Sequence, residues 1–167
     1  RALFSRLGIG QVDTISDFME TLKFFHVIGP LASDRIASMS CSGGEASLMA
    51  DLTLDSGLTY PPLNETQRVG LRAALGPMVK LANPLDYHTY IWGNVEASTA
   101  TFSAMLGAGY AMNLLILDFP RADRCDASTW DAMLDAFEAA QRATGAKAAI
   151  LSSLPESLPE SIGARML

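Results

Sequence analysis

A chain of 167 residues with 49% hydrophobic and 18% charged residues is long and apolar enough to bury a core without disulfides or metals, which excludes a disordered chain. The formal charge of −6, from 12 basic and 18 acidic residues, argues against a nucleic-acid partner. No apolar run approaches the roughly 20 residues that span a bilayer, and Cys41 and Cys125 lie far apart, so we expect free thiols, no membrane partner and a cytoplasmic location.

The first predicted elements are a helix, a strand and a second helix. Thr14 opens a capping pattern that is followed by apolar residues at helical spacing, which predicts a helix up to about Gly29. Residues 35–40 predict a short strand, and two glycines then lead into a helical pattern over residues 45–52. This order indicates a strand, a tight turn and a helix.

The middle of the chain predicts a second strand and two more helices. Residues 58–60 are typical of a short strand. Asn64, with Gln67 in the reciprocal capping position, predicts a helix up to about Leu75. Residues 96–106 also have helical character, so helices follow both of these segments.

The last part of the chain contains the clearest strand signal. The run 112–118 is almost wholly apolar, which is typical of a strand that is covered on both faces of a parallel sheet. A helix is predicted from Ser128, which would begin its cap, to a stop at Gly145. A strand over residues 147–152 and a helix over residues 159–167 follow.

The alternation of strands and helices predicts the fold class. Strands that alternate with helices form parallel β-α-β units with helices on both faces of the sheet. No internal repeat, low-complexity segment or charge run interrupts the pattern. We therefore predict a doubly wound α/β sheet and a single domain over residues 1–167.

The strongest candidate site follows the first predicted strand. Ligands of an open parallel sheet bind beyond the carboxyl ends of its strands. Two glycines permit a tight turn there, and the free N–H groups of the next helix can hold an anion such as phosphate. The spacing matches neither the kinase phosphate loop nor the dinucleotide fingerprint, so a plain turn that binds nothing is the alternative. The candidate residues are Ser40, Cys41, Ser42, Gly43, Gly44 and Glu45.

A second candidate lies in the aromatic-rich loop that begins at Asn83. Asn83 and the proline after it predict an extended segment. Asp86 and His88 follow, and this pair could serve proton transfer because histidine titrates near neutral pH. A loop histidine that is hydrogen-bonded to the backbone is the simpler interpretation.

Two further loops follow predicted strands. The loop 118–124 mixes acids with Arg121 and Arg124, which could clamp a phosphate or pair with the acids of their own loop. The pairing is the favoured interpretation. Residues 152–156 offer only two serines, a leucine, a proline and a glutamate, so we assign no function to them.

The candidate residues also resemble a known family. The run 40–46 keeps the frame of a Thr-Asn-Ala-Gly-Gly-Pro-Gly motif, and Gly57-Leu58 and residues 83–86 match Gly-Leu and Asn-Pro-Val-Asp signatures. The opening residues 2–9 resemble the stretch that follows a Ser-His-Thr-Gly phosphohistidine loop. On these motifs nearly the whole chain resembles the flavodoxin-like domain of NDP-forming acyl-CoA synthetases, relatives of succinyl-CoA synthetase.

The resemblance implies a reaction and partners. It implies one flavodoxin-like part of a larger ligase that converts acid, CoA and ATP to acyl-CoA, ADP and phosphate. A histidine upstream of Arg1 would be phosphorylated, and residues 40–45 would receive it. CoA and ATP or ADP with Mg²⁺ would serve the full enzyme, together with CoA-binding and ATP-grasp domains and a small-molecule acid. No cofactor, metal or turnover is expected of this fragment alone, and a further strand and helix after Leu167 would leave one sheet edge incompletely covered.

Departures from the motif keep two other functions open. Cys41 replaces the usual Asn, Glu45 the usual Pro and Ala46 a Gly, and a carboxylate in the first helical turn repels phosphate. The first alternative is a flavodoxin-like module that binds a flavin or another small ligand. The second is a docking domain whose glycine turn holds nothing.

Overall fold

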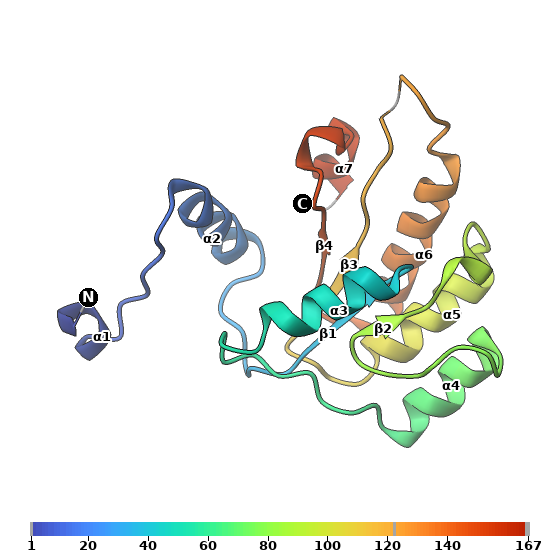
Figure 1. Cartoon of the computed structure of the whole chain (residues 1–167), viewed down its shortest axis with the longest axis horizontal. Helices are drawn as coiled ribbons and strands as arrows, with labels where there is room; N and C mark the ends of the chain where they lie inside the picture. The colour runs from blue at the N-terminus through green and yellow to red at the C-terminus, as the bar shows by residue number, and fades with distance from the viewer. Residues whose placement is uncertain (1, 122, 166–167) are drawn as a thin grey trace. The chain divides into compact units, whose positions relative to one another are not determined.

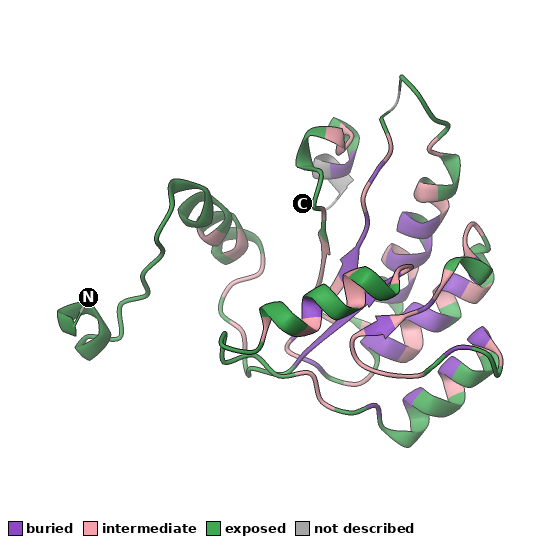
Figure 2. Ribbon diagram, in the orientation of Figure 1, coloured by how far each residue is buried: buried purple, intermediate pink, exposed green. Residues whose placement is uncertain are grey.

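The computed structural model describes residues 2–121 and 123–165, which divide into two compact units on either side of Leu31 (Figure 1). The first unit contains helices α1 (Ala2–Arg6) and α2 (Ile15–Val27). The backbone N–H of Asp17 donates to Thr14 Oγ1 over 3.0 Å, so the predicted cap is confirmed. None of the described residues of this unit is buried (Figure 2).

The second unit contains a parallel sheet of four strands in the order β2-β1-β3-β4. Ile36 lies opposite Met112, and Asn113 lies opposite Ala148, so the first, third and fourth strands are in parallel register. The predicted parallel sheet is confirmed. Its strands are β1 (Ile36–Ser40), β2 (Leu85–Asp86), β3 (Met112–Ile116) and β4 (Ala148–Leu151).

Helices cover both faces of this sheet, as predicted. Helix α3 contacts β1 and β2, whereas α5 packs between α4 and α6 and lies with them on the other face (Figure 1). Short 3₁₀ turns η1 (Thr89–Ile91) and η2 (Pro155–Ser157) follow β2 and β4. The helices are α3 (Gly43–Leu52), α4 (Glu65–Leu75), α5 (Val95–Leu106), α6 (Ser128–Thr144) and α7 (Glu160–Arg165).

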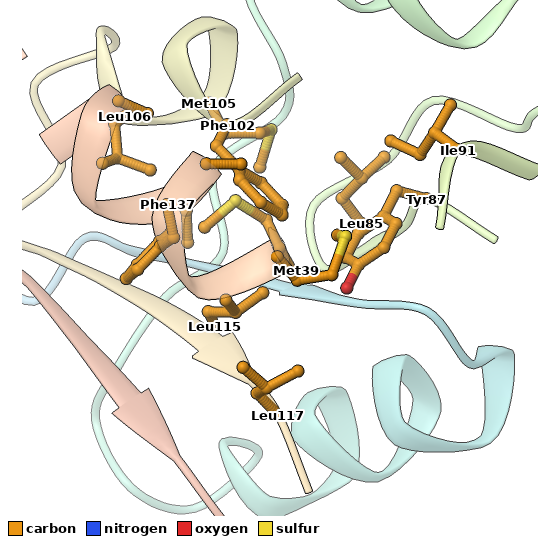
Figure 3. Close-up of a cluster of buried hydrophobic side chains, with 14 of the residues drawn as sticks. Met39, Leu85, Tyr87, Ile91, Phe102, Met105, Leu106, Leu115, Leu117 and Phe137 are labelled. Atoms are coloured by element: carbon orange, nitrogen blue, oxygen red, sulfur yellow. The ribbon is translucent and has the colours of Figure 1, made fainter. Parts of the chain in front are cut away.

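The main core lies between the sheet and helices α4 to α6 (Figure 3). Met39 and Leu115 project from the central strands and are fully buried. Phe102 packs edge-to-face on Phe137 at 5.7 Å and on Tyr87 at 5.4 Å between ring centroids. Each fully buried side chain of this size contributes about 1.5–3 kcal/mol, so this layer holds the carboxyl ends of the strands in place.

The outer edge of β1 differs from the prediction. Thr59 makes only an isolated bridge with Arg35, so the strand predicted over residues 58–60 was wrong. Two prolines follow, and proline has no N–H to continue a strand ladder. The Asn83 side chain fills the gap: its Oδ1 accepts from the Ser38 N–H at 3.3 Å, and its Nδ2 donates to the Ile36 carbonyl at 3.0 Å.

Two predicted element ends are also corrected. Helix α6 begins at Ser128, and its preceding residue Ala127 makes no side-chain cap. The Asp126 carboxylate instead accepts hydrogen bonds from the backbone and hydroxyl of Ser128, both at 2.9 Å. The strand predicted over 112–118 ends at Ile116. Residues 166–167 of the last predicted helix lie outside the described residues.

The size of the domain stays a prediction. The cluster of buried apolar residues is built wholly from the second unit, so residues 2–31 add nothing to it. Strand β4 forms one edge of the sheet; its first three residues are partly buried and Leu151 is exposed. The incompletely covered edge that a further strand and helix would leave stays a prediction. Among the described residues, none of the helices combines the length and apolarity that crossing a membrane requires.

Candidate functional site

The candidate site lies at the carboxyl edge of the sheet, where α3 begins. Ser42 precedes the helix in an extended conformation and makes no side-chain cap. The first helical bond runs from the Ala46 N–H to the Ser42 carbonyl at 3.0 Å. Within the described chain, the backbone N–H groups of Gly43, Gly44 and Glu45 therefore have no acceptor. These donors can bind an anion or an electronegative atom.

Glu45 brings a carboxyl group to the same helix end. Its Oε2 has no solvent exposure and no hydrogen-bond partner among the described residues. Burial raises the pKa of this carboxyl above its usual range, and the charges of Asp118 and Asp86 raise it further. Three carboxylates thus lie close together around the start of α3.

Asp86 and His88 form a small cluster after β2. Asp86 Oδ1 accepts a hydrogen bond from the His88 backbone N–H at 2.9 Å, and Asp86 Oδ2 lies 3.6 Å from His88 Nε2. His88 has a φ of 58°, and its ring stacks on Tyr90 at 5.3 Å. A Cβ added to Gly43 would lie 3.2 Å from Asp86 Oδ2. The predicted loop therefore does reach the glycine turn.

Asp118 follows β3 and binds the loop after β4. Its carboxylate accepts hydrogen bonds from the Ser152 hydroxyl at 2.9 Å, the Ser153 N–H at 2.6 Å, the Ser153 hydroxyl, and the Leu154 N–H at 3.3 Å. Partial burial would raise the pKa of Asp118, but these hydrogen bonds outweigh it and lower the pKa. Asp118 thus stays ionised beside Glu45.

A cavity of about 510 Å³ opens at this edge of the sheet. The rings of Trp92 and Trp130 meet edge-to-face at 5.2 Å between centroids, and Trp130 Nε1 donates to the Asp118 carbonyl at 2.7 Å. Burial, followed by the charge of Glu45, raises the pKa of the Cys41 thiol. No Lys or Arg occurs among the described residues that line the cavity. These residues are Cys41, Glu45, Thr89, Trp92, Ile116, Leu117, Asp118 and Trp130.

Other predicted residues have structural roles instead. Asn83 pairs with the middle of β1, below the carboxyl edge, and so completes the sheet. Arg121 binds the Asp123 carboxylate through two nitrogens, at 3.0 and 2.7 Å, and Arg124 lies 3.5 Å from it. This matches the favoured interpretation of a loop that pairs its own charges.

The described residues do not fit the cofactors of the full reaction. They contain no group of three or more His, Cys, Asp or Glu side chains placed to hold a metal ion. The cavity also lacks the basic side chains that usually pair with the phosphates of CoA or a nucleotide. We therefore derive no step through Mg²⁺, CoA or ATP on this domain.

Two groups at the site were not predicted. Ser152 and Ser153 were assigned no function, although both bind Asp118. Two adjacent serines directly after a strand were the available signal, because the carboxyl ends of parallel strands meet at one edge. Trp130 had been assigned no role at a site, yet it lines the cavity beside Trp92.

Comparison with known proteins supports the fold. No family model matches the chain, and no curated protein matches it. The crystal structure of PH0766 from Pyrococcus horikoshii OT3 is similar, with a TM-score of 0.77 and 22% identity over 99% of this chain and 38% of that one. The flavodoxin-like, doubly wound class predicted from the sequence agrees with this shared α/β architecture.

A named enzyme shares the fold as well. Dinucleotide-forming acetyl-coenzyme A synthetase 1 from Ca. Korarchaeum cryptofilum is 14% identical, with TM-scores of 0.74 for its apo form and 0.75 for its complex with phosphate and ADP. Both alignments cover 99% of this chain and 36% of that one. The chain thus spans little more than a third of the length of these structures.

Proposed function

We propose that this chain is a domain of an NDP-forming acyl-CoA synthetase, and that the start of α3 receives the phosphohistidine loop of that enzyme. One observation carries the proposal. The backbone N–H groups of Gly43, Gly44 and Glu45 have no acceptor within the described chain, and they follow a parallel strand in the frame of the family motif. Such donors stabilise a phosphoryl group through hydrogen bonds and the helix dipole.

The carboxylates beside these donors would repel a free phosphate ion. A phosphohistidine differs, because its imidazole ring, once protonated on the second nitrogen, can donate that N–H to a carboxylate while its phosphoryl group meets the helix. Asp86 and Glu45 are the acceptors that lie at the start of α3. A loop tethered to the same enzyme also arrives at high effective concentration, which offsets part of the repulsion.

The complete reaction needs other parts of the enzyme. Within the proposal, CoA-binding and ATP-grasp domains supply the sites for CoA, ATP or ADP and Mg²⁺, and a small-molecule acid is the acyl donor. This domain contributes backbone donors and carboxylates that orient the histidine and its phosphoryl group. By itself it should not turn over substrate.

The proposal can be tested by placing a branched side chain at the glycine turn of the complete enzyme. A Cβ at Gly44 would meet only Ser42 Oγ at 3.5 Å, which is an ordinary contact, whereas one at Gly43 would crowd Asp86. Gly44→Val should therefore keep the fold but block close approach of a phosphoryl group. Phosphohistidine formed from ATP should fall at least tenfold.

The control is Ser47→Val, which places the same side chain at an exposed position of α3 one turn further along. It should leave phosphohistidine formation unchanged. Parental levels of phosphohistidine in Gly44→Val would reduce this segment to a plain turn. Gly43→Val is expected to lose phosphoryl transfer as well, but it also displaces Asp86 and is the less specific variant.

A further inference from the structure

The cavity at the carboxyl edge has a chemistry of its own, apart from the free N–H groups of α3. Two acidic residues, Glu45 and Asp118, and two aromatic residues, Trp92 and Trp130, are among the residues that line it. Among the described residues, none that lines the cavity has a positively charged side chain. The cavity is therefore negative and aromatic, and it is suited to a cation.

The two acids of the cavity differ in their hydrogen bonds, because Asp118 has donors within the domain and Glu45 Oε2 has none among the described residues. Asp118 is held in the ionised form by donors from the loop after β4. Glu45 Oε2 is shielded from solvent without a partner, which is costly unless a donor or a positive charge reaches it. The Tyr87 hydroxyl is also buried and has no partner among the described residues. Burial raises its pKa, and the nearby charges of Cys41 and Glu45 raise it further.

The aromatic walls define the rest of the ligand. Trp92 and Trp130 stand nearly perpendicular, at 80°, and the bond from Trp130 Nε1 to the Asp118 carbonyl holds one of them in place. A cation over an indole face gains roughly 0.5–2 kcal/mol. Ile116 and Leu117 add apolar surface next to the rings. A ligand with an apolar or aromatic body and a positively charged end would match all of these groups.

We propose that this cavity binds a small organic cation, with an ammonium or guanidinium group directed at Glu45 and Asp118 and an apolar body against Trp92 and Trp130. This assignment goes beyond the proposed function, because it concerns a free ligand and does not require phosphohistidine. Gly43 and Gly44 do not line the cavity. Loss of phosphohistidine docking and loss of cation binding can therefore be told apart.

Intrinsic fluorescence tests the proposal directly on this chain. The sequence contains two tryptophans, and both line the cavity, so their emission reports on the cavity alone. The probe is benzylammonium, compared with benzyl alcohol as the neutral analogue and benzoate as the anion. Benzylammonium should change the emission saturably at millimolar concentrations, and the other two should not.

Two variants assign the binding to Glu45. Glu45→Gln should weaken benzylammonium binding by about tenfold, equivalent to about 1.4 kcal/mol. Glu65→Gln is the matched control, because Glu65 is also an acid in a first helical turn but lies exposed on α4. It should bind as the parent does. Thermal unfolding of both variants checks that the fold is retained.

Three results would overturn the proposal. The first is no saturable change of emission with benzylammonium in a folded parent chain. The second is an equal response to benzyl alcohol or benzoate, which would show that the positive charge is not recognised. The third is unchanged affinity in Glu45→Gln, which would place the cation elsewhere.

Discussion

Asp118 and Glu45 are two carboxyl groups in the wall of one cavity, and their surroundings shift them in opposite directions. Asp118 accepts hydrogen bonds from the loop after β4, and its pKa is lowered. Glu45 has an oxygen with neither solvent nor partner, and its pKa is raised. Both groups lie at the same edge of the sheet. The opposite shifts therefore show that the hydrogen-bond donors around a carboxyl decide whether its pKa falls or rises.

The hydrogen bonds of the two carboxyls also suggest different roles for Asp118 and Glu45. Asp118 ties β3 to the chain after β4, so its role is explained by the fold. Glu45 Oε2 makes no hydrogen bond to the described residues, and a buried polar atom without a partner requires another explanation. We infer that the partner of Glu45 comes from outside this domain.

The largest expected loss of stability comes from removing the hydrogen-bonded carboxylate of Asp118. Asp118→Ala leaves the donors of Ser152, Ser153 and Leu154 without their acceptor. We expect a loss of about 1–2 kcal/mol in the free energy of unfolding, since water can reach part of this loop. Urea denaturation measures it. Asp51→Ala, at an exposed position of α3, is the control and should change stability by less than about 0.5 kcal/mol.

A smaller effect is expected when one donor is removed. Ser153→Ala deletes the hydroxyl that binds Asp118 but keeps the backbone N–H that donates at 2.6 Å. The expected loss is about 0.5–1 kcal/mol, measured by the same denaturation. Ser47→Ala, on the exposed side of α3, serves as the control. A loss in Ser153→Ala as large as in Asp118→Ala would contradict the idea of a shared network.

Neutralising Glu45 should slightly raise the stability of the fold, whereas the two preceding variants lower it. Because its folded pKa is raised above the unfolded value of about 4.3, its contribution to stability is complete below that value and is lost as the pH rises through the folded pKa. Glu45→Gln avoids this loss, although it also gives up a favourable charge at the helix start. Solvent reaches part of this side chain and screens its charge, so we expect a gain of no more than about 0.5 kcal/mol near pH 7 that disappears below about pH 4.

Stability curves of parent and variant against pH measure this difference. Glu65→Gln removes an exposed first-turn acid and should show no comparable gain at neutral pH. A gain in Glu45→Gln that is constant with pH would mean that the titration of Glu45 is not its cause.

The smallest expected effect concerns the thiol beside Glu45. Burial and then the Glu45 charge raise the pKa of Cys41, so its reactive thiolate is scarce. Cys125 is exposed, and we expect it to react with iodoacetamide before Cys41. Glu45→Gln should modestly speed the labelling of Cys41 and leave Cys125 unchanged, as read by mass spectrometry. Equal acceleration at both thiols would indicate a loosened fold rather than a local charge effect.

Local signals predicted most of the elements correctly. Asn64 and Gln67 form the reciprocal cap of α4, and Gly145 ends α6 in the left-handed conformation. These signals act over a few residues, so the sequence alone contains them. The predicted strand over residues 58–60 failed because strand formation needs a partner, and the chain leaves β1 after a single bridge at Thr59.

The candidate site was predicted in part for the same reason. Gly43 and Gly44 adjoin their strand and helix in the chain, so the turn and its free N–H groups follow from the order of residues. Asn83 was placed near the site, but its amide matches the spacing of donors and acceptors on β1 and is used there. An asparagine amide can bind a ligand or pair with a strand backbone, and the groups that surround it in the folded chain decide between the two.

By itself, the sequence determined the parallel α/β class, most of the helix ends and the glycine turn, because hydrophobic period, caps and turns are local properties. The tertiary structure alone decided that Ser152 and Ser153 bind Asp118 across more than thirty residues, and that Trp92 meets Trp130 over the same cavity. It also left one carboxyl oxygen of Glu45, Oε2, shielded from solvent and without a partner among the described residues. Charge, burial and hydrogen bonding at a site depend on which segments meet in space, and the sheet brings those segments together only once it has folded.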